Sequence, residues 1–255
     1  MKHLKWCRRT LGNYFGVEIH KRYPHQPRRS MSEALEHIAS LGFYPRTIID
    51  VGVAEGTPDL YRIFPNAFFV LIEPLREFED DLKAILQKHR GTYVIAAAAA
   101  QEGHSEINVH LDHLNGSSLY KEAMGIEADG ITRTVNTIQI DKFSTDRSLS
   151  TPYLMKLDVQ GGELDVLDGC SQALRETEVA ILEVSMFQFM KGAPQFHDVV
   201  SYMKEREFVA YDIITAWNRP FDNALGQVDM FFVKEFGRFR ASHVYSTLEQ
   251  RRNLF

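Results

Sequence analysis

The sequence predicts an α/β fold in which helices cover both faces of a mostly parallel sheet. From about residue 47, short β-rich runs alternate with helix-like segments, the pattern of βαβ units. The runs are nearly continuous in apolar residues, as expected of parallel strands buried on both faces. The 255 residues are 44% hydrophobic and 25% charged, which fits one large α/β domain or two small ones. Disorder, collagen-like repeats and a coiled coil are excluded.

The elements are expected in the following order. A helix over residues 30–41 precedes the sheet. Strands are predicted at residues 47–53, 67–73, 92–98, 153–159, 179–184, 208–214 and 228–234. Helices are predicted at residues 76–88, 162–174 and 195–206, together with a short helix that has Thr57 as N-cap and Pro58 at its first position.

One segment interrupts the alternation. Residues 104–111 and 133–140 both have the pattern of strands, and no helix is predicted between them. We therefore expect an extra β-hairpin insertion that pairs antiparallel at the edge of the strand over residues 92–98. A glycine-containing loop through residues 115–118 connects its two strands.

The formal charge of -5 is unevenly distributed along the chain. Residues 1–29 hold eight Lys or Arg and one acid, a charge of +7, and residues 236–255 hold four and one, a charge of +3, which leaves -15 for residues 30–235. We accordingly expect a basic N-terminal arm with a leading helix at residues 1–46, the sheet domain at 47–235 and a basic C-terminal tail at 236–255. The acidic body disfavours nucleic acid as a partner.

Aromatic and aliphatic residues interleave with the basic residues of the N-terminal arm, namely Trp6, Leu11, Tyr14 and Phe15. Three roles stay open for this arm: packing over a cofactor, forming a homo-oligomer, or peripheral contact with an anionic membrane. Only Cys7 and Cys170 are present, too far apart in the sequence to suggest a disulfide framework or a zinc site. With no long apolar run and no secretory signal pattern, we expect a cytoplasmic protein.

The most informative motif starts at the end of the first predicted strand. Asp50, Gly52 and Gly56 place a carboxylate and two glycines in the turn that leads into a helix. The glycines allow a ligand to approach the backbone, and the spacing differs from the G-x-G-x-x-G of dinucleotide-binding proteins. A carboxylate here pairs with an ammonium group and repels a diphosphate. A nicotinamide oxidoreductase is therefore disfavoured.

A second acid, Glu73, ends the next strand and offers an acceptor for both hydroxyls of a ribose. Ala97 and Ala98, at the end of the third strand, leave room for an adenine ring. Together with Asp50, these residues predict a site for a nucleoside joined to an amino acid. S-adenosylmethionine is the common cofactor of that composition.

Several strings now identify a resemblance to the FkbM-type S-adenosylmethionine-dependent methyltransferases, from about residue 47 to residue 235. They are Asp-Val-Gly at 50–52, Glu-Pro at 73–74, Gly-Ser-Ser-Leu at 116–119, Thr-Ile-Gln-Ile-Asp at 137–141, Lys-Leu-Asp-Val-Gln-Gly-Gly-Glu at 156–163 and Asp-Met-Phe-Phe-Val at 229–233. The resemblance implies a Rossmann-like, seven-stranded class I methyltransferase sheet with an antiparallel last strand. It also implies methyl transfer to a hydroxyl, commonly of a sugar, glycolipid or secondary metabolite. Ala54 departs from the family pattern, which usually has Asn there.

The predicted catalytic residues lie at the carboxyl edge of the sheet. Asp158 ends one strand and is the first candidate for the base that accepts the hydroxyl proton, and Glu183, at the end of the next strand, is the second. For the acceptor we predict Ser117, Trp217 and Arg219, which belong to loops at the same edge.

No metal is predicted. His110, Asp112 and His113 lie on a strand-to-loop junction that gives no support for a closed coordination sphere. Mg²⁺ held by Asp158 and Glu183 stays open, because hard oxygen ligands at converging strand ends suit that ion. A cofactor-binding but non-catalytic interaction module of the same fold is the alternative to an enzyme.

Overall fold

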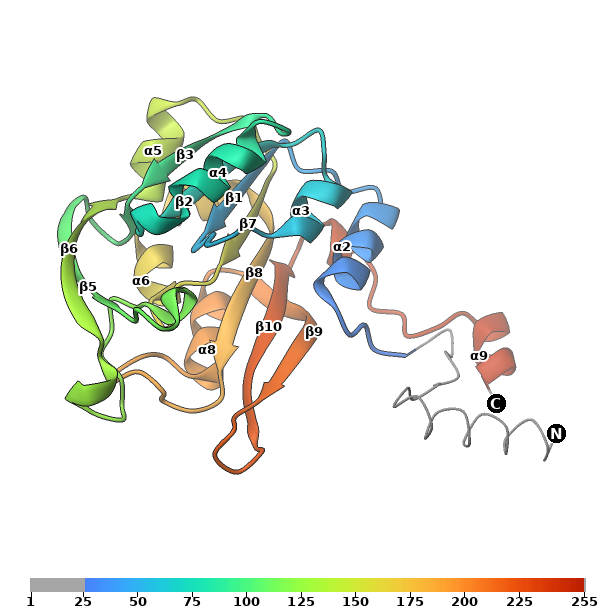
Figure 1. Cartoon of the computed structure of the whole chain (residues 1–255). Helices are drawn as coiled ribbons and strands as arrows, with labels where there is room; N and C mark the ends of the chain where they lie inside the picture. Colours follow the sequence, from blue (N-terminus) through green and yellow to red (C-terminus); the bar gives the residue numbers. More distant parts are fainter. Residues whose placement is uncertain (1–25, 255) are drawn as a thin grey trace, which may run out of the picture.

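The fold is built on a seven-stranded sheet with the order β3-β2-β1-β7-β8-β10-β9, in a computed structural model that describes residues 26–254 (Figure 1). The strands are β3 Gly91–Ile95, β2 Phe68–Glu73, β1 Thr47–Val51, β7 Tyr153–Leu157, β8 Thr177–Ser185, β10 Leu225–Lys234 and β9 Phe208–Asn218. The first five are parallel, and β10 is antiparallel to both of its neighbours. The predicted Rossmann-like sheet with an antiparallel last strand is confirmed, and its strand order reverses between β1 and β7.

Helices cover both faces of this sheet, as predicted. One face packs against α2 Met31–Ser40, α3 Pro58–Ile63 and α4 Glu79–Leu86. The other packs against α5 Ile140–Asp146, α6 Glu163–Asp168, α7 Ser171–Glu176 and α8 Phe196–Glu205. Neighbouring strand residues alternate between the two cores: Ile48 belongs to the first and Ile49 to the second. Both side chains are fully buried, which explains why the strands lack a polar face.

The helix starts differ in how they are capped. Ser30 caps α2, because its hydroxyl accepts a hydrogen bond from the Glu33 amide at 3.2 Å. Pro58 begins α3 as predicted, but the side chain of Thr57 makes no capping bond. Through Leu35 and Ile38, α2 buries apolar surface against the main sheet, so this leading helix is packed onto the sheet domain.

The β-hairpin insertion exists, but it belongs to a second sheet of order β4-β6-β5 and not to the edge of the first. Its antiparallel strands are β5 Gly103–Val109 and β6 Ile131–Ile138, and β6 also pairs with β4 Ala97–Ala98. The strand predicted over residues 92–98 divides at Ala96, whose amide still bonds the Glu73 carbonyl at 3.0 Å. Beyond that residue the chain pairs with β6, and this pairing is parallel, not antiparallel as predicted. The strand predicted to reach residue 140 ends at Ile138, because α5 begins at Ile140.

Two predicted helices are also divided. Residues 76–88 form a 3₁₀ turn, η1 Arg76–Phe78, followed by α4, and residues 162–174 form α6 and α7. The break between α6 and α7 lies at Gly169, where a Cβ would come within 2.1 Å of the Ala99 carbonyl oxygen. This close passage of two backbone segments ends α6 earlier than its apolar pattern indicated.

The chain after β10 returns to the end of α2. It forms η4 Arg238–Arg240 and later α9 Leu248–Leu254 (Figure 1). The Arg238 guanidinium donates to the carbonyls of Leu41 and Gly42, both at 3.1 Å. Across residues 26–254, no helix has the length and apolar character needed to cross a bilayer. Most of the basic N-terminal arm, with its aromatic residues and Cys7, falls outside the described residues.

Candidate functional site

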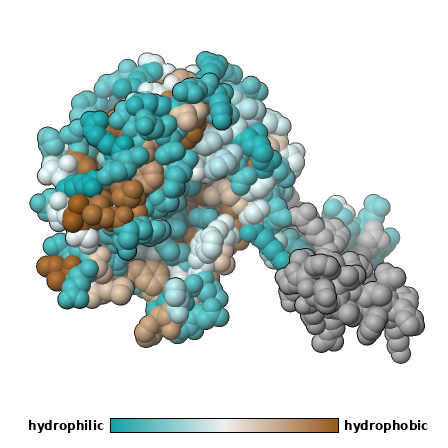
Figure 2. All heavy atoms as spheres, viewed as in Figure 1, coloured by the Kyte–Doolittle hydropathy of each residue, from teal (hydrophilic) through white to brown (hydrophobic). Residues whose placement is uncertain are grey.

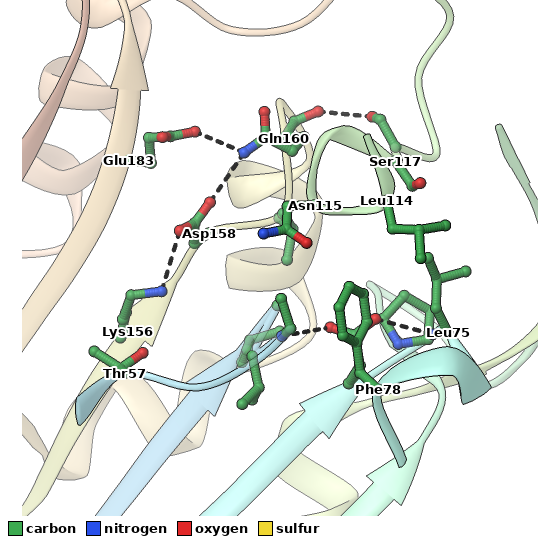
Figure 3. A pocket seen from close by; sticks show the side chains of 18 of the residues that line it. Thr57, Leu75, Phe78, Leu114, Asn115, Ser117, Lys156, Asp158, Gln160 and Glu183 are labelled. Atoms are coloured by element: carbon green, nitrogen blue, oxygen red, sulfur yellow. Dashed lines mark hydrogen bonds and ion pairs between the residues drawn. The ribbon is translucent and has the colours of Figure 1, made fainter. Parts of the chain in front are cut away.

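A cavity of about 690 Å³ opens at the carboxyl edge of the sheet, beside the β1–β7 reversal (Figure 3). This is where open α/β sheets bind ligands. The cavity brings together residues that are far apart in the sequence. Nine of the predicted site residues line it: Gly52, Gly56, Glu73, Ala97, Ala98, Ser117, Asp158, Glu183 and Trp217. Asp50 and Arg219 are absent from its lining.

Both glycines of the β1–α3 turn have a positive φ, a backbone conformation that favours glycine. Gly52 has a φ of +71°, and a Cβ on it would lie 1.8 Å from the Asp158 carbonyl oxygen. Gly56 has a φ of +113°, and a Cβ there would meet the Ile85 side chain at 2.9 Å. Gly52 therefore lets the β1–α3 turn pass close to the backbone at the end of β7, where the cavity begins. Both glycines line the cavity, and the room that they make for a ligand stays a prediction.

Glu73 is held in one orientation by the backbone around it. Its two carboxylate oxygens accept hydrogen bonds from the amides of Ala54, at 3.0 Å, and Leu75, at 2.9 Å. Burial raises the pKa of this carboxyl to about 7. Each oxygen keeps a lone pair after accepting its amide bond. The carboxyl is thus a fixed acceptor in the wall formed by β2.

Asp50 lies beneath the cavity and not in its wall. Its side chain is 0% exposed. Oδ2 accepts a hydrogen bond from the Tyr61 hydroxyl at 3.3 Å, whereas Oδ1 has no hydrogen bond and lies 3.8 Å from the Lys156 ammonium. Burial raises the pKa of Asp50, and the charge of Lys156 opposes that rise.

Lys156 connects Asp50 to the predicted catalytic acids. Its ammonium donates to Asp158 Oδ2 at 3.2 Å, and Gln160 Nε2 donates both to Asp158 Oδ1, at 3.1 Å, and to Glu183 Oε2, at 2.9 Å (Figure 3). The amide of Gln227 donates to the same Glu183 oxygen at 2.9 Å. Both oxygens of Asp158 therefore accept hydrogen bonds. Of the two Glu183 oxygens only Oε2 does, because no described group donates to Oε1.

This network holds more acids than the single positive charge of Lys156 can compensate. Burial, followed by the negative charge of Asp158, raises the pKa of Glu183 to about 9. The same two causes raise the pKa of Asp229, on β10, to about 6. Although burial lowers the pKa of Lys156, the charges of Asp158 and Asp50 outweigh that effect and raise it. The cavity therefore favours a positively charged ligand.

The β5–β6 connection forms a roof over one half of the cavity. Its turn η2 Leu114–Gly116 is tied to the β1–α3 turn, because the Asn115 amide donates to the Glu55 carboxylate at 2.9 Å. The Ser118 hydroxyl donates to the Gln160 carbonyl at 2.7 Å. Apolar contacts hold the roof onto the ends of β2 and β5; they involve Ala54, Leu75, Phe78, Ile107, Val109, Leu114 and Leu119.

Trp217 lines the other half of the cavity. Two projections of the molecule carry exposed apolar side chains (Figure 2). On the β9–β10 hairpin, Trp217 is 63% and Phe221 90% exposed. The loop that contains η3 Ile126–Ala128 exposes Met124 and Ile126. Arg219, predicted to bind the acceptor, instead pairs with Asp222 at 2.6 Å outside the cavity lining.

Four residues of the site had no role predicted from the sequence: Lys156, Gln160, Gln227 and Tyr61. The pairing of Lys156 with Asp158 could have been predicted from the sequence, since residues two apart along a strand point to the same face. The role of Gln227 could not have been predicted in this way, because its proximity to Glu183 depends on the antiparallel register of β8 and β10. In the part of the chain that the structure describes, no three His, Cys, Asp or Glu side chains could hold a metal ion.

Comparison with known proteins places these features in a family. A model of the methyltransferase FkbM domain matches residues 50–210. No curated protein matches the sequence significantly. Among solved structures, magnesium protoporphyrin IX methyltransferase from Synechocystis PCC 6803, with bound SAM, is 10% identical with a TM-score of 0.45, over 80% of this chain and 76% of that one. The precorrin-6y C5,15-methyltransferase of Geobacter metallireducens is 10% identical with a TM-score of 0.42, over 85% and 93%.

Proposed function

The chain belongs to the FkbM family of methyltransferases, and from that premise we propose that it transfers the methyl group of S-adenosylmethionine to a hydroxyl of a sugar, a glycolipid or a secondary metabolite. The observation that carries the proposal is the cavity at the β1–β7 reversal. It joins a fixed acceptor for a ribose, Glu73, to an acid-rich wall with an unengaged carboxylate oxygen on Glu183.

The residues present fit the cofactor. S-adenosylmethionine supplies an electrophilic methyl group on a positively charged sulfur. Glu73 would accept the ribose hydroxyls, and the small buried side chains of Ala97 and Ala98 leave space beside it for the adenine ring. The positive charges of the cofactor would be attracted by the acids around Lys156, among which Asp50 acts from beneath the floor.

We assign the role of general base to Glu183 and that of orienting group to Asp158. Asp158 has both oxygens engaged, by Lys156 and by Gln160, so its charge is already compensated. Glu183 Oε2 is fixed by two amides, which leaves Oε1 to accept the proton of an alcohol. Its raised pKa makes it a stronger base than an ordinary carboxylate. Binding of a sulfonium nearby lowers that pKa and brings the ionised form into the neutral range.

The open half of the cavity supports an acceptor that has both hydroxyls and an apolar part. Trp217 lines the cavity and offers a ring face for stacking on a sugar or another ring. The exposed side chains of Phe221, Met124 and Ile126 extend the apolar surface beyond the opening. Ser117, in the roof, adds a hydroxyl to the same lining.

Calorimetry and a transfer assay test this proposal. We expect the purified chain to bind S-adenosylmethionine, and we expect Glu73→Ala to weaken that binding at least about tenfold, the effect of losing one or more charge-assisted hydrogen bonds. Glu77→Ala, on the neighbouring turn and outside the cavity lining, is the matched control. Labelled cofactor incubated with fractionated cell extract then identifies the acceptor. Cofactor binding without S-adenosylhomocysteine formation on any fraction would favour the non-catalytic alternative, and absence of binding would refute both.

A further inference from the structure

A second cavity, of about 740 Å³, lies at the opposite edge of the main sheet, where the parallel strands begin. Four segments form it: the residues that lead into β1, the α3–β2 connection, the residue before β3, and the α5–β7 connection (Figure 1). It is large enough for a small-molecule ligand. The length of β1 separates it from the catalytic cavity by roughly 16 Å, at about 3.3 Å per residue.

Three arginines line this cavity, each from a different segment: Arg46, Arg90 and Arg147. Its described lining, residues 44–47, 63–68, 90 and 147–150, contains no Asp or Glu. Within residues 26–254, none of the three guanidinium groups has a hydrogen bond or an ion pair. Elsewhere arginines pair with acids, as Arg62 does with Glu36 at 3.1 Å. Such a cluster is unexpected in a body of charge -15.

Hydrogen bonds or a ring contact hold each of the three arginines in place. The carbonyls of Arg46 and Arg90 accept hydrogen bonds from the first residues of β2, Phe68 and Phe69, at 2.9 and 2.8 Å. The guanidinium carbon of Arg147 lies 3.8 Å from the ring centroid of Phe143, which limits the positions that this side chain can take. The positive charges are thus presented from fixed points around one space.

Neutral donors complete the lining. Asn66, Ser148 and Ser150 contribute side chains that bond no other described residue. Tyr44, 65% exposed, packs edge-on against Phe64 with ring centroids 6.4 Å apart and leaves ring surface at the rim. Guanidinium forks, hydroxyls and an amide are the groups that bind phosphate oxygens in proteins.

We propose that this cavity binds a phosphorylated small molecule, with its phosphate oxygens shared among Arg46, Arg90 and Arg147. A dianionic or more highly charged group supplies the counter-charge that the lining lacks. The ligand is distinct from the methyl donor and from the reacting hydroxyl, because the sheet stands between the two cavities. The proposal is independent of the methyltransferase assignment.

Calorimetric titration of the full chain with pyrophosphate tests the site directly. S-adenosylhomocysteine is kept at saturation, so that the catalytic cavity is occupied. We expect one binding site per chain and an affinity at least tenfold higher for pyrophosphate than for inorganic phosphate, since a diphosphate can reach more than one arginine. The combined variant Arg46→Gln, Arg90→Gln, Arg147→Gln should lose this binding. Each single variant should weaken it several-fold.

Arg175→Gln is the matched control: Arg175 is exposed and lies just before β8, outside the cavity lining. Thermal melts establish that all variants fold, which is expected because the three side chains are exposed. Equal pyrophosphate affinity in the wild type and the combined variant would overturn the proposal. Cosedimentation with phosphatidylcholine vesicles that contain phosphatidic acid, if lost in the combined variant, would assign the phosphate to a lipid headgroup and overturn a soluble ligand.

Discussion

The two edges of the main sheet carry cavities of similar size and opposite chemistry. At the carboxyl edge, about 690 Å³ is lined by acids that are engaged with one another through Lys156 and Gln160. At the amino edge, about 740 Å³ is lined by three arginines that have no acidic neighbour in the lining. The same short strands run between the two. Their termini, and not the strands themselves, therefore determine what each end can bind.

The comparison also shows two ways of placing charge in a protein. The carboxyl edge buries its charges, and each buried acid depends on a named partner inside the network. At the amino edge, the three arginines of the cavity are exposed to water, where an unpaired charge costs little stability. Substitutions at the first edge should therefore change both stability and chemistry, whereas substitutions of the three arginines at the second should change binding with little effect on stability.

The largest effect is expected from Glu183→Gln. The amide cannot accept a proton, so turnover with the identified acceptor should fall about 10²- to 10⁴-fold, the usual contribution of a general base. The affinity for S-adenosylmethionine should change much less. Glu178→Gln, at the amino end of the same strand β8, is the control and should keep normal turnover. The rate of S-adenosylhomocysteine formation measures turnover. A fully active Glu183→Gln variant would contradict the assignment of Glu183 and return the role of base to Asp158.

Lys156→Met should give the largest loss of stability. It leaves Asp50 buried without its cationic neighbour, and breaking a buried pair costs about 3–5 kcal/mol of unfolding free energy. The matching change at the amino edge is Lys234→Met, which removes a half-exposed pair with Glu178 at 3.5 Å and should cost about 1 kcal/mol or less. Urea unfolding monitored by circular dichroism measures both. Equal losses of unfolding free energy in the two variants would show that burial does not determine how much each ion pair stabilises the protein.

The stability of the ligand-free protein should decrease as the pH rises. The pKa is raised to about 7 for Glu73 and Glu163, about 6 for Asp229 and about 9 for Glu183, so between pH 4.5 and 9 the folded state binds more protons than the unfolded state. These groups contribute stability that is fully present at low pH and lost as the pH passes each folded-state pKa.

Melting temperatures measured from pH 6 to pH 9 check this dependence. We expect a decrease of several degrees, given about 2–4 °C per kcal/mol for a domain of this size. The Glu183→Gln variant should show a smaller decrease in melting temperature, because it lacks the carboxyl with the highest of these four pKa values. A melting temperature that rises over this range would contradict the assignment.

Arg46→Gln should have the smallest effect. The side chain is exposed and has no described partner, so the unfolding free energy should change by no more than about 0.5 kcal/mol. Methyl transfer should be unchanged, because the residue lies at the far end of β1. A loss of turnover in this variant would show that the two edges communicate, and would make the amino-edge cavity part of the catalytic cycle.

Much of this architecture follows from local sequence. The strands predicted at residues 47–53, 67–73 and 153–159 are found at 47–51, 68–73 and 153–157, because an unbroken apolar run is typical of a strand buried on both faces. The division at Ala96 and the break at Gly169 had no local signal, since each depends on a segment that arrives from elsewhere in the chain.

The site was predictable to the same extent. Carboxylates and glycines at strand ends were found, because the carboxyl ends of parallel strands share one edge. The position of Asp50 beneath the floor was not predictable, since it depends on which way the end of β1 is turned. The arginine cavity had no signal at all: Arg46, Arg90 and Arg147 are separated by more than 40 residues at each step, and only the fold brings them together.

The roof over the catalytic cavity has a consequence for the order of events. It lies over the half next to Glu73 and is tied down by the bond from Asn115 to Glu55, whereas the half next to Trp217 stays open. A molecule in the inner half must pass the outer half to leave. We therefore expect a compulsory-order cycle, with S-adenosylmethionine first on and S-adenosylhomocysteine last off. Product inhibition by S-adenosylhomocysteine should be competitive against the methyl donor and noncompetitive against the acceptor.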